Sequence, residues 1–296
     1  MGFEFKHRSG IEAQVREIAR EQIDKALQAC GDGGAEFDAL VHKLRRHCKR
    51  LRGLLRLIEP RFKGWKQEDR IFRDAARSLS GTRDAAVLVD TFAKLMTLGR
   101  QREGGTRIGE ERGGALVAWL EARVASSPTG EERVRALEPF TVLFAATAGR
   151  AESWSLTGRG FERIGDGLEA TYRRMRDGLA VAADEQTPEA LHAWRKDTKY
   201  HWHHVGLLHA AAPDLLRARK AALDRLGEML GDHHNLAVLE DTLAERGDGG
   251  VREAITEQQA VLASDAIALG RQLTAEKPAM LRDRFEQYWS LLPEKS

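Results

Sequence analysis

The side chains best suited to binding a ligand lie in residues 41–58, which contain seven Lys or Arg, two His and no Asp or Glu. At about 100° per residue, one face of this stretch is apolar, and the opposite face carries His42, Arg45, Arg46 and Lys49. Like charges three or four residues apart destabilise a helix by a few tenths of a kcal/mol per pair. We therefore predict that this face binds an anion that offsets the repulsion.

A second stretch, residues 191–208, repeats this pattern, with His192, Arg195, Lys196 and Lys199 each 150 residues after its counterpart. A second pair of similar segments, residues 79–88 and 230–239, lies 151 residues apart. The two spacings agree to one residue, which predicts an internal repeat with halves at residues 1–150 and 151–296. Arg presents a planar fork to phosphate oxygens, and Lys presents a mobile point charge. Two such helices facing one another would suit a linear polyanion with closely repeated charge.

The elements around these stretches are predicted to be helical throughout, because apolar residues recur at helical spacing and no segment alternates with the period of a strand. Thr187 and Pro188 have the residue types of a helix start, and Asp84 and Asn235 are expected to cap the helices that they begin. Residues 99–114 contain six glycines and are predicted to form a flexible loop. The sequence thus predicts an all-α fold with helices over residues 11–29, 41–58, 61–79, 84–98, 115–126, 131–150, 161–183, 188–211, 213–230, 235–246, 251–273 and 277–291.

The composition is typical of a globular protein, with 42% hydrophobic and 31% charged residues, which excludes a disordered chain. The formal net charge of +2 predicts no partner by itself, so only the distribution of charge is informative. Cys30 and Cys48 both fall in helical patterns and are expected to be free thiols in a reducing compartment. No apolar run is long enough for a membrane span, and the N-terminus lacks a signal-peptide pattern, so we expect a cytoplasmic protein.

The paired H-x-x-R-(R/K)-x-x-K helices and the paired turns that end in V-L resemble the CHAD domain, the conserved-histidine α-helical domain. The similarity covers residues 10–291. It implies two four-helix bundles related by an approximate two-fold axis, with a basic central pore. It also implies binding of inorganic polyphosphate and association with polyphosphate granules, without catalysis of its own. We expect other polyanions as further ligands, and no catalytic residue, cofactor or metal.

The resemblance assigns ligand binding to residues of the two motif helices, and the helix before each one contributes an additional arginine. The second copy is expected to be less basic, because Tyr200 and Trp202 replace Arg50 and Arg52 and because Asp197 adds an acid. The predicted polyphosphate-binding residues are His42, Arg45, Arg46, Lys49, Arg50, Arg52, His192, Arg195, Lys196, Lys199 and His203, together with Arg20 and Arg173.

Three other functions remain open from the residues alone. His42 or His192 could carry a phosphoryl group in a phosphotransfer or phosphate-metabolising protein, although no paired carboxylates, Gly-rich phosphate loop or Mg²⁺-ligand set accompanies them. The cations could follow a nucleic-acid backbone, although no base-reading motif is present. The third alternative is a metal site formed by histidines of the second half, although they lack the compact helical pair with a carboxylate that is typical of zinc sites. These histidines are His201, His203, His204, His209, His233 and His234. The sequence leaves the oligomeric state open.

Overall fold

The computed structural model describes residues 3–32, 34–79, 83–101, 108–124, 128–244 and 249–295. These residues form eleven α-helices and two short 3-10 helices, with no strand among them, so the predicted all-α fold class is confirmed. The elements are α1 (Ile11–Cys30), α2 (Phe37–Ile58), η1 (Glu59–Arg61), α3 (Trp65–Ser78), α4 (Arg83–Gln101), α5 (Glu110–Glu121), α6 (Gly130–Ala151), α7 (Glu162–Glu185), α8 (Pro188–Leu207), η2 (His209–Ala211), α9 (Pro213–Leu243), α10 (Gly249–Leu273) and α11 (Pro278–Ser290).

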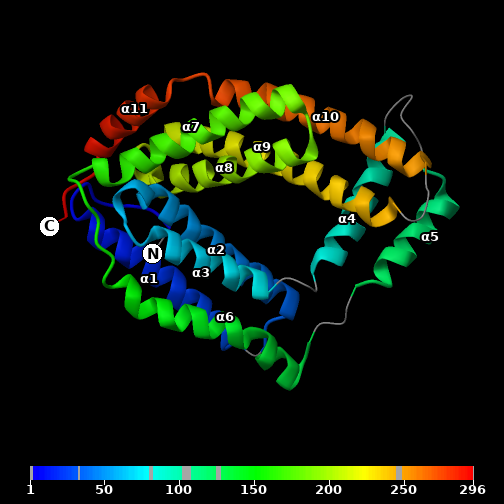
Figure 1. The fold of residues 1–296 in the computed structure, drawn as a ribbon, viewed down its shortest axis with the longest axis horizontal. Helices are drawn as coiled ribbons and strands as arrows, with labels where there is room; N and C mark the ends of the chain where they lie inside the picture. Colours follow the sequence, from blue (N-terminus) through cyan, green and yellow to red (C-terminus); the bar gives the residue numbers. More distant parts are fainter. Residues whose placement is uncertain are drawn as a thin grey trace.

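The helices form two layers with a smaller group at one end (Figure 1). Helices α1, α2, α3 and α6 make one layer, α7 to α11 make the other, and α4 and α5 lie at the end. One large apolar core joins both layers and includes Leu51, Trp194 and Phe285. A second core joins α4 and α5 to α9 and α10, with Phe92 and Leu239 among its members. Helices α2 and α4, both from the first 150 residues, therefore pack against helices from the second half of the chain.

Helices α2 and α8 begin at defined caps and cross at a glycine. The Glu36 carboxylate accepts hydrogen bonds from Asp38 N at 3.0 Å and Ala39 N at 2.7 Å at the start of α2. The Thr187 side chain accepts from Ala190 N at 3.2 Å at the start of α8, as predicted.

At the crossing, a Cβ atom added to Gly53 would lie 2.7 Å from His203 Cβ, so only glycine permits this approach. His204 Nε2–H donates to Gly53 O at 3.1 Å and joins the two helices. The crossing therefore fixes the two cation-bearing helices side by side.

The helix break predicted between residues 230 and 235 is wrong, because α9 is continuous there. The helix runs without interruption from Pro213 to Leu243, so Asn235 lies in its interior and caps nothing. Leu230 belongs to the large core and Leu236 to the small one, so burial on both sides of the polar segment favours one continuous helix. The side chain of Asp84, the other expected cap, lies outside the described residues.

The glycine-rich segment predicted to be a loop over residues 99–114 is partly helical. Helix α4 continues to Gln101, and α5 begins at Glu110. A Cβ atom at Gly113 would lie 2.2 Å from Met96 Cε, so this glycine allows α5 to pack closely on α4. Residues 102–107 lie outside the described part of the chain. Cys30 and Cys48 are free thiols, as expected.

Candidate functional site

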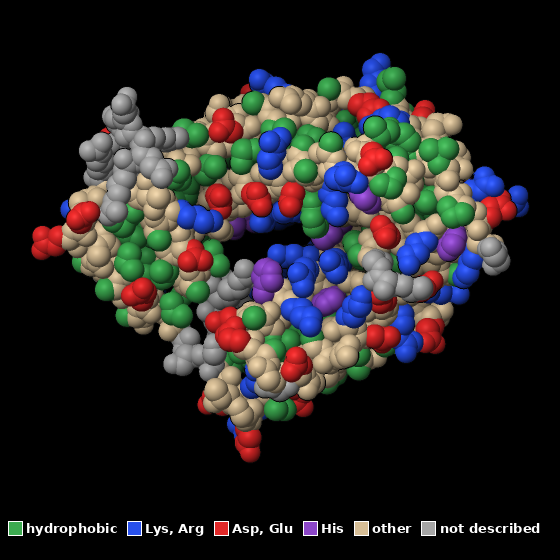
Figure 2. Space-filling model, turned by 180° about the vertical axis from the view of Figure 1, so that it is seen from behind, with side chains coloured by type: hydrophobic (Ala, Val, Ile, Leu, Met, Phe, Trp, Pro, Cys, Tyr) green, Lys and Arg blue, Asp and Glu red, His purple; other side chains and the backbone are tan. Residues whose placement is uncertain are grey.

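A cleft of about 400 Å³ lies between α2 and α8, and residues of both motif helices line it. Figure 2 shows the corresponding face hollowed at its centre, where Lys, Arg and His side chains gather. Seven of the lining residues are Lys or Arg, and none is Asp or Glu. The lining residues are His42, Arg45, Arg46, Lys49, Arg52, His192, Arg195, Lys196, Lys199, Tyr200, Trp202 and His203.

Three predicted site residues lie outside this cleft, and the other ten line it. Arg20, on α1, pairs with Asp24 at 3.0 Å and also with Glu152. Arg50 points to the side of α2 that faces α1, where its guanidinium donates to Gln22 Oε1 at 3.3 Å and lies over the Phe3 ring. These two residues are therefore held by other parts of the structure.

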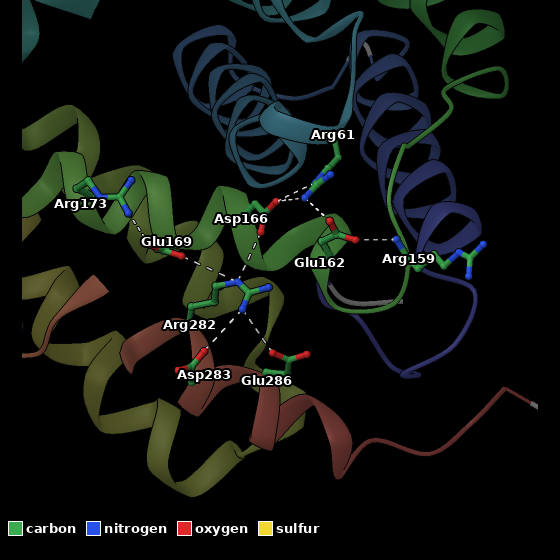
Figure 3. A network of polar contacts seen from close by, with 9 residues as sticks. All are labelled: Arg61, Arg159, Glu162, Asp166, Glu169, Arg173, Arg282, Asp283 and Glu286. Atoms are coloured by element: carbon green, nitrogen blue, oxygen red, sulfur yellow. Dashed lines mark hydrogen bonds and ion pairs between the residues drawn. The ribbon is translucent and has the colours of Figure 1, made fainter. Parts of the chain in front are cut away.

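Arg173, the third residue outside the cleft, belongs to a polar network that joins η1, α7 and α11 (Figure 3). It pairs with Glu169, which lies 4.0 Å from Arg282. Arg61 Nε donates to Asp166 at 2.8 Å in the same network. Arg173 is thus an exposed residue whose ion pair lies within α7 and links it to the network through Glu169.

Two cleft cations have carboxylate partners from helices behind the cleft. Arg52 makes a bidentate pair with Asp69 of α3, at 2.8 Å and 3.3 Å. Lys199 Nζ lies 3.3 Å from Asp224 of α9. The sequence could not indicate these partners, because the carboxylates come from other helices. The net positive charge of the cleft is therefore smaller than its count of cations.

The comparison with known protein families identifies the chain. The model of the CHAD domain matches residues 17–244, which include α2, α8 and the whole cleft. The chain belongs to the CHAD domain family. No curated protein sequence matches it.

The aromatic residues that α8 contributes to this CHAD cleft contact cations in the cleft and beside it. Arg52 and Arg56 lie over the Tyr200 ring, 5.8 Å and 5.2 Å from its centroid. Lys199 and Lys220 lie over the Trp202 ring at 5.2 Å and 5.3 Å. Such cation–π contacts contribute about 0.5–2 kcal/mol each, depending on exposure. Lys220 of α9, which no sequence motif indicated, therefore lies beside the cleft against one of its aromatic lining residues.

Asp197 was expected to add an acid to the second copy, and it lies beside the cleft without lining it. Its carboxylate pairs with Arg174 of α7 at 3.2 Å. Burial raises the pKa of Asp197, while Arg174 opposes this shift. Asp197 therefore contributes to the contact between α7 and α8.

Two histidines of the CHAD cleft, the half-buried His192 and the buried His203, are neutral near pH 7. The His192 ring lies 4.0 Å from the His234 ring, and burial, His234 and the neighbouring cations lower the pKa of His192 to about 4. Burial lowers the pKa of His203 well below its ordinary value, and its ring packs edge-on against Trp202. His42, in contrast, is exposed. A neutral imidazole still offers one N–H donor to an anion.

Two glycines of α9 make room for cations of the CHAD cleft. A Cβ atom at Gly227 would lie 2.6 Å from Lys199 Cε, and one at Gly231 would lie 3.2 Å from an Arg195 guanidinium nitrogen. Both cations therefore lie against the backbone of α9. Burial lowers the pKa of Arg195, so the protein bears a desolvation cost for keeping this charge in the cleft.

Two further properties of the described residues bear on function. No group of three or more His, Cys, Asp or Glu side chains is placed to hold a metal ion in this part of the chain. None of the described helices combines the length and apolar character needed to cross a bilayer.

Proposed function

We propose that this CHAD protein binds inorganic polyphosphate in the cleft between α2 and α8 and does not act on it chemically. The observation that carries the proposal is a single cleft lined by seven Lys or Arg side chains and no carboxylate. A linear phosphate polymer has the matching charge, because each of its units is anionic. Arg would bind its oxygens through planar forks and Lys through a point charge.

The proposal includes two related halves that each contribute one wall of a basic central pore. His42 and His192, Arg45 and Arg195, Arg46 and Lys196, and Lys49 and Lys199 are pairs at one constant spacing in the sequence, and all of them line the cleft. If the repeated residues only stabilised the fold, their cations would not be expected to line the same cleft. Their shared position is instead expected for residues that bind one ligand. Binding to polyphosphate would also bring the protein to polyphosphate granules.

Binding without catalysis is supported by how the nearest carboxylates are used. Asp69 neutralises Arg52, and Asp224 neutralises Lys199, so both act as counter-ions. A phosphoryl-transfer site needs carboxylates that position a nucleophile or magnesium. Asp69 and Asp224 pair with cations instead, which is expected for a site that binds an anion without catalysis.

The test is a charge-reversed variant, Arg45→Glu with Arg195→Glu, titrated with long-chain polyphosphate at physiological salt. Neither side chain contributes to the apolar core, so we expect binding to be lost while the helical circular dichroism spectrum is unchanged. Wild-type binding by the double variant would refute the proposed site. Duplex DNA as competitor separates polyphosphate from nucleic-acid binding, and a labelled phosphodonor that left an acid-labile phosphate on His42 or His192 would indicate phosphotransfer instead.

A further inference from the structure

A second basic hollow lies on the other side of α2, between that helix and α1, with a volume of about 530 Å³. We call it the α1–α2 groove, and its lining includes Lys25, Asp32, Lys43, Arg46, His47 and Arg50. Four of these residues are cations and one is a carboxylate. Lys25 also pairs with Glu21 at 2.7 Å. The groove therefore has net positive charge without belonging to the central cleft.

Arg46 connects the two hollows, because it lines both the central cleft and the α1–α2 groove. On α2, Lys43, Arg46 and Arg50 follow one another at i, i+3 and i+7, which places them in one stripe along the helix. This stripe spans about 10 Å along the helix axis at 1.5 Å per residue. It runs beside the stripe that lines the cleft, so the cationic surface of α2 continues past the cleft without a break at Arg46.

The charges in the groove repel one another. Burial, and then the neighbouring Arg46, lower the pKa of Arg50. The hydrogen bond from Arg50 to Gln22 Oε1 goes to a neutral amide, and the nearby Glu21 carboxylate offsets only part of the effect of burial and Arg46 on the guanidinium. His47 adds no charge, because burial and the surrounding cations lower its pKa to about 4. An anion in the groove would relieve this repulsion.

We propose that a polyphosphate chain held in the central cleft continues past Arg46 into the α1–α2 groove, so that the protein prefers chains long enough to occupy both. This inference rests on the proposed function of the cleft and adds a chain-length preference to it. A short phosphate oligomer would occupy only the cleft and would not contact the groove.

The test compares two probes, tripolyphosphate and a long polyphosphate chain, on the variant Lys25→Gln with Lys43→Gln. Both side chains are exposed, so the fold should tolerate the change. We expect affinity for the long chain to fall several-fold and its salt slope to shrink by about 0.7, the contribution of Lys43, because Lys25 is already paired with Glu21. Affinity for tripolyphosphate should stay unchanged.

Two further variants make the comparison decisive. Arg271→Gln with Lys277→Gln removes the same charge from exposed positions that line neither hollow and should alter neither affinity. Arg46→Gln should weaken both probes. Equal losses for both probes, or no loss for either, in the Lys25 and Lys43 variant would overturn the groove while leaving the cleft intact. Failure of the wild-type protein to bind either probe would refute the proposed function and this extension together.

Discussion

The salt dependence of binding should count the cations that hold the ligand. For a single-stranded polyanion, the logarithm of the binding constant falls with the logarithm of salt concentration by about 0.7 per neutralised charge. Seven cleft cations would give a slope of about −5. Arg52 and Lys199 are paired with Asp69 and Asp224, so the slope should be less steep than this full count. Each charge that the ligand neutralises should weaken binding about 2.6-fold between roughly 50 and 200 mM salt.

The variant Arg45→Gln with Arg195→Gln removes two charges from the cleft. It should make the slope less steep by about 1.4, so that the loss of affinity over the same salt range is about sevenfold smaller. The measurement is fluorescence anisotropy, in a salt series, of an end-labelled polyphosphate short enough to occupy the cleft alone. The matched control is Arg20→Gln with Arg173→Gln, which removes two exposed arginines that lie outside the cleft and are paired with carboxylates. An unchanged slope in the first variant would refute the assignment of the cleft, and a reduced slope in the control would add Arg20 and Arg173 to the site.

Three further predictions follow from the buried histidines and the glycines of α9. His204 is fully buried and its pKa is lowered from 6.5 to about 3, so the unfolded chain binds its proton first and stability is lost as the pH falls below 6.5. His204→Gln should remove about 2 kcal/mol of the stability difference between pH 7.5 and 5, measured by chemical denaturation. Gly231→Ala should weaken polyphosphate binding several-fold by displacing Arg195 without lowering the unfolding temperature, whereas Gly149→Ala, which meets no neighbour, should leave binding unchanged. The pKa of His192, about 4 in the free protein, should rise beside bound phosphate, so calorimetry near pH 5.5 in buffers of different ionisation enthalpy should detect proton uptake that His192→Gln reduces.

The positions within each motif helix could be predicted because helical geometry fixes them. Arg45 and Arg52 are seven residues apart and lie on the same face, and both line the cleft. Arg50 is rotated about 140° from Arg45 at 100° per residue, which explains why it faces α1. The ion pairs of Arg20 with Asp24 and of Arg173 with Glu169 also follow from helical geometry, because each carboxylate lies four residues from its arginine.

The remaining features depend on contacts between helices that are distant in the sequence. The carboxylates that pair with cleft cations come from other helices, Asp69 from α3 and Asp224 from α9. Lys220 of α9 contacts the Trp202 ring in the same way. No local sequence pattern indicates these contacts. The polar segment before Asn235 has the composition of a break, yet apolar burial in two separate cores keeps α9 continuous there. In both cases tertiary packing overrides what local sequence favours.

The repulsion between the cations of the cleft is limited by neutral side chains that lie among them. Seven cations on two helices that cross at Gly53 repel one another, and burial adds a cost at Arg195. His203 stays neutral at the crossing, where a charged side chain in the same buried place would add to that repulsion. Tyr200 and Trp202 bring ring faces to the cations without adding charge, so they orient them while limiting the repulsion. The aromatic residues Tyr200 and Trp202 of α8 are therefore suited to a cleft that is strongly cationic and still folds in the absence of its ligand.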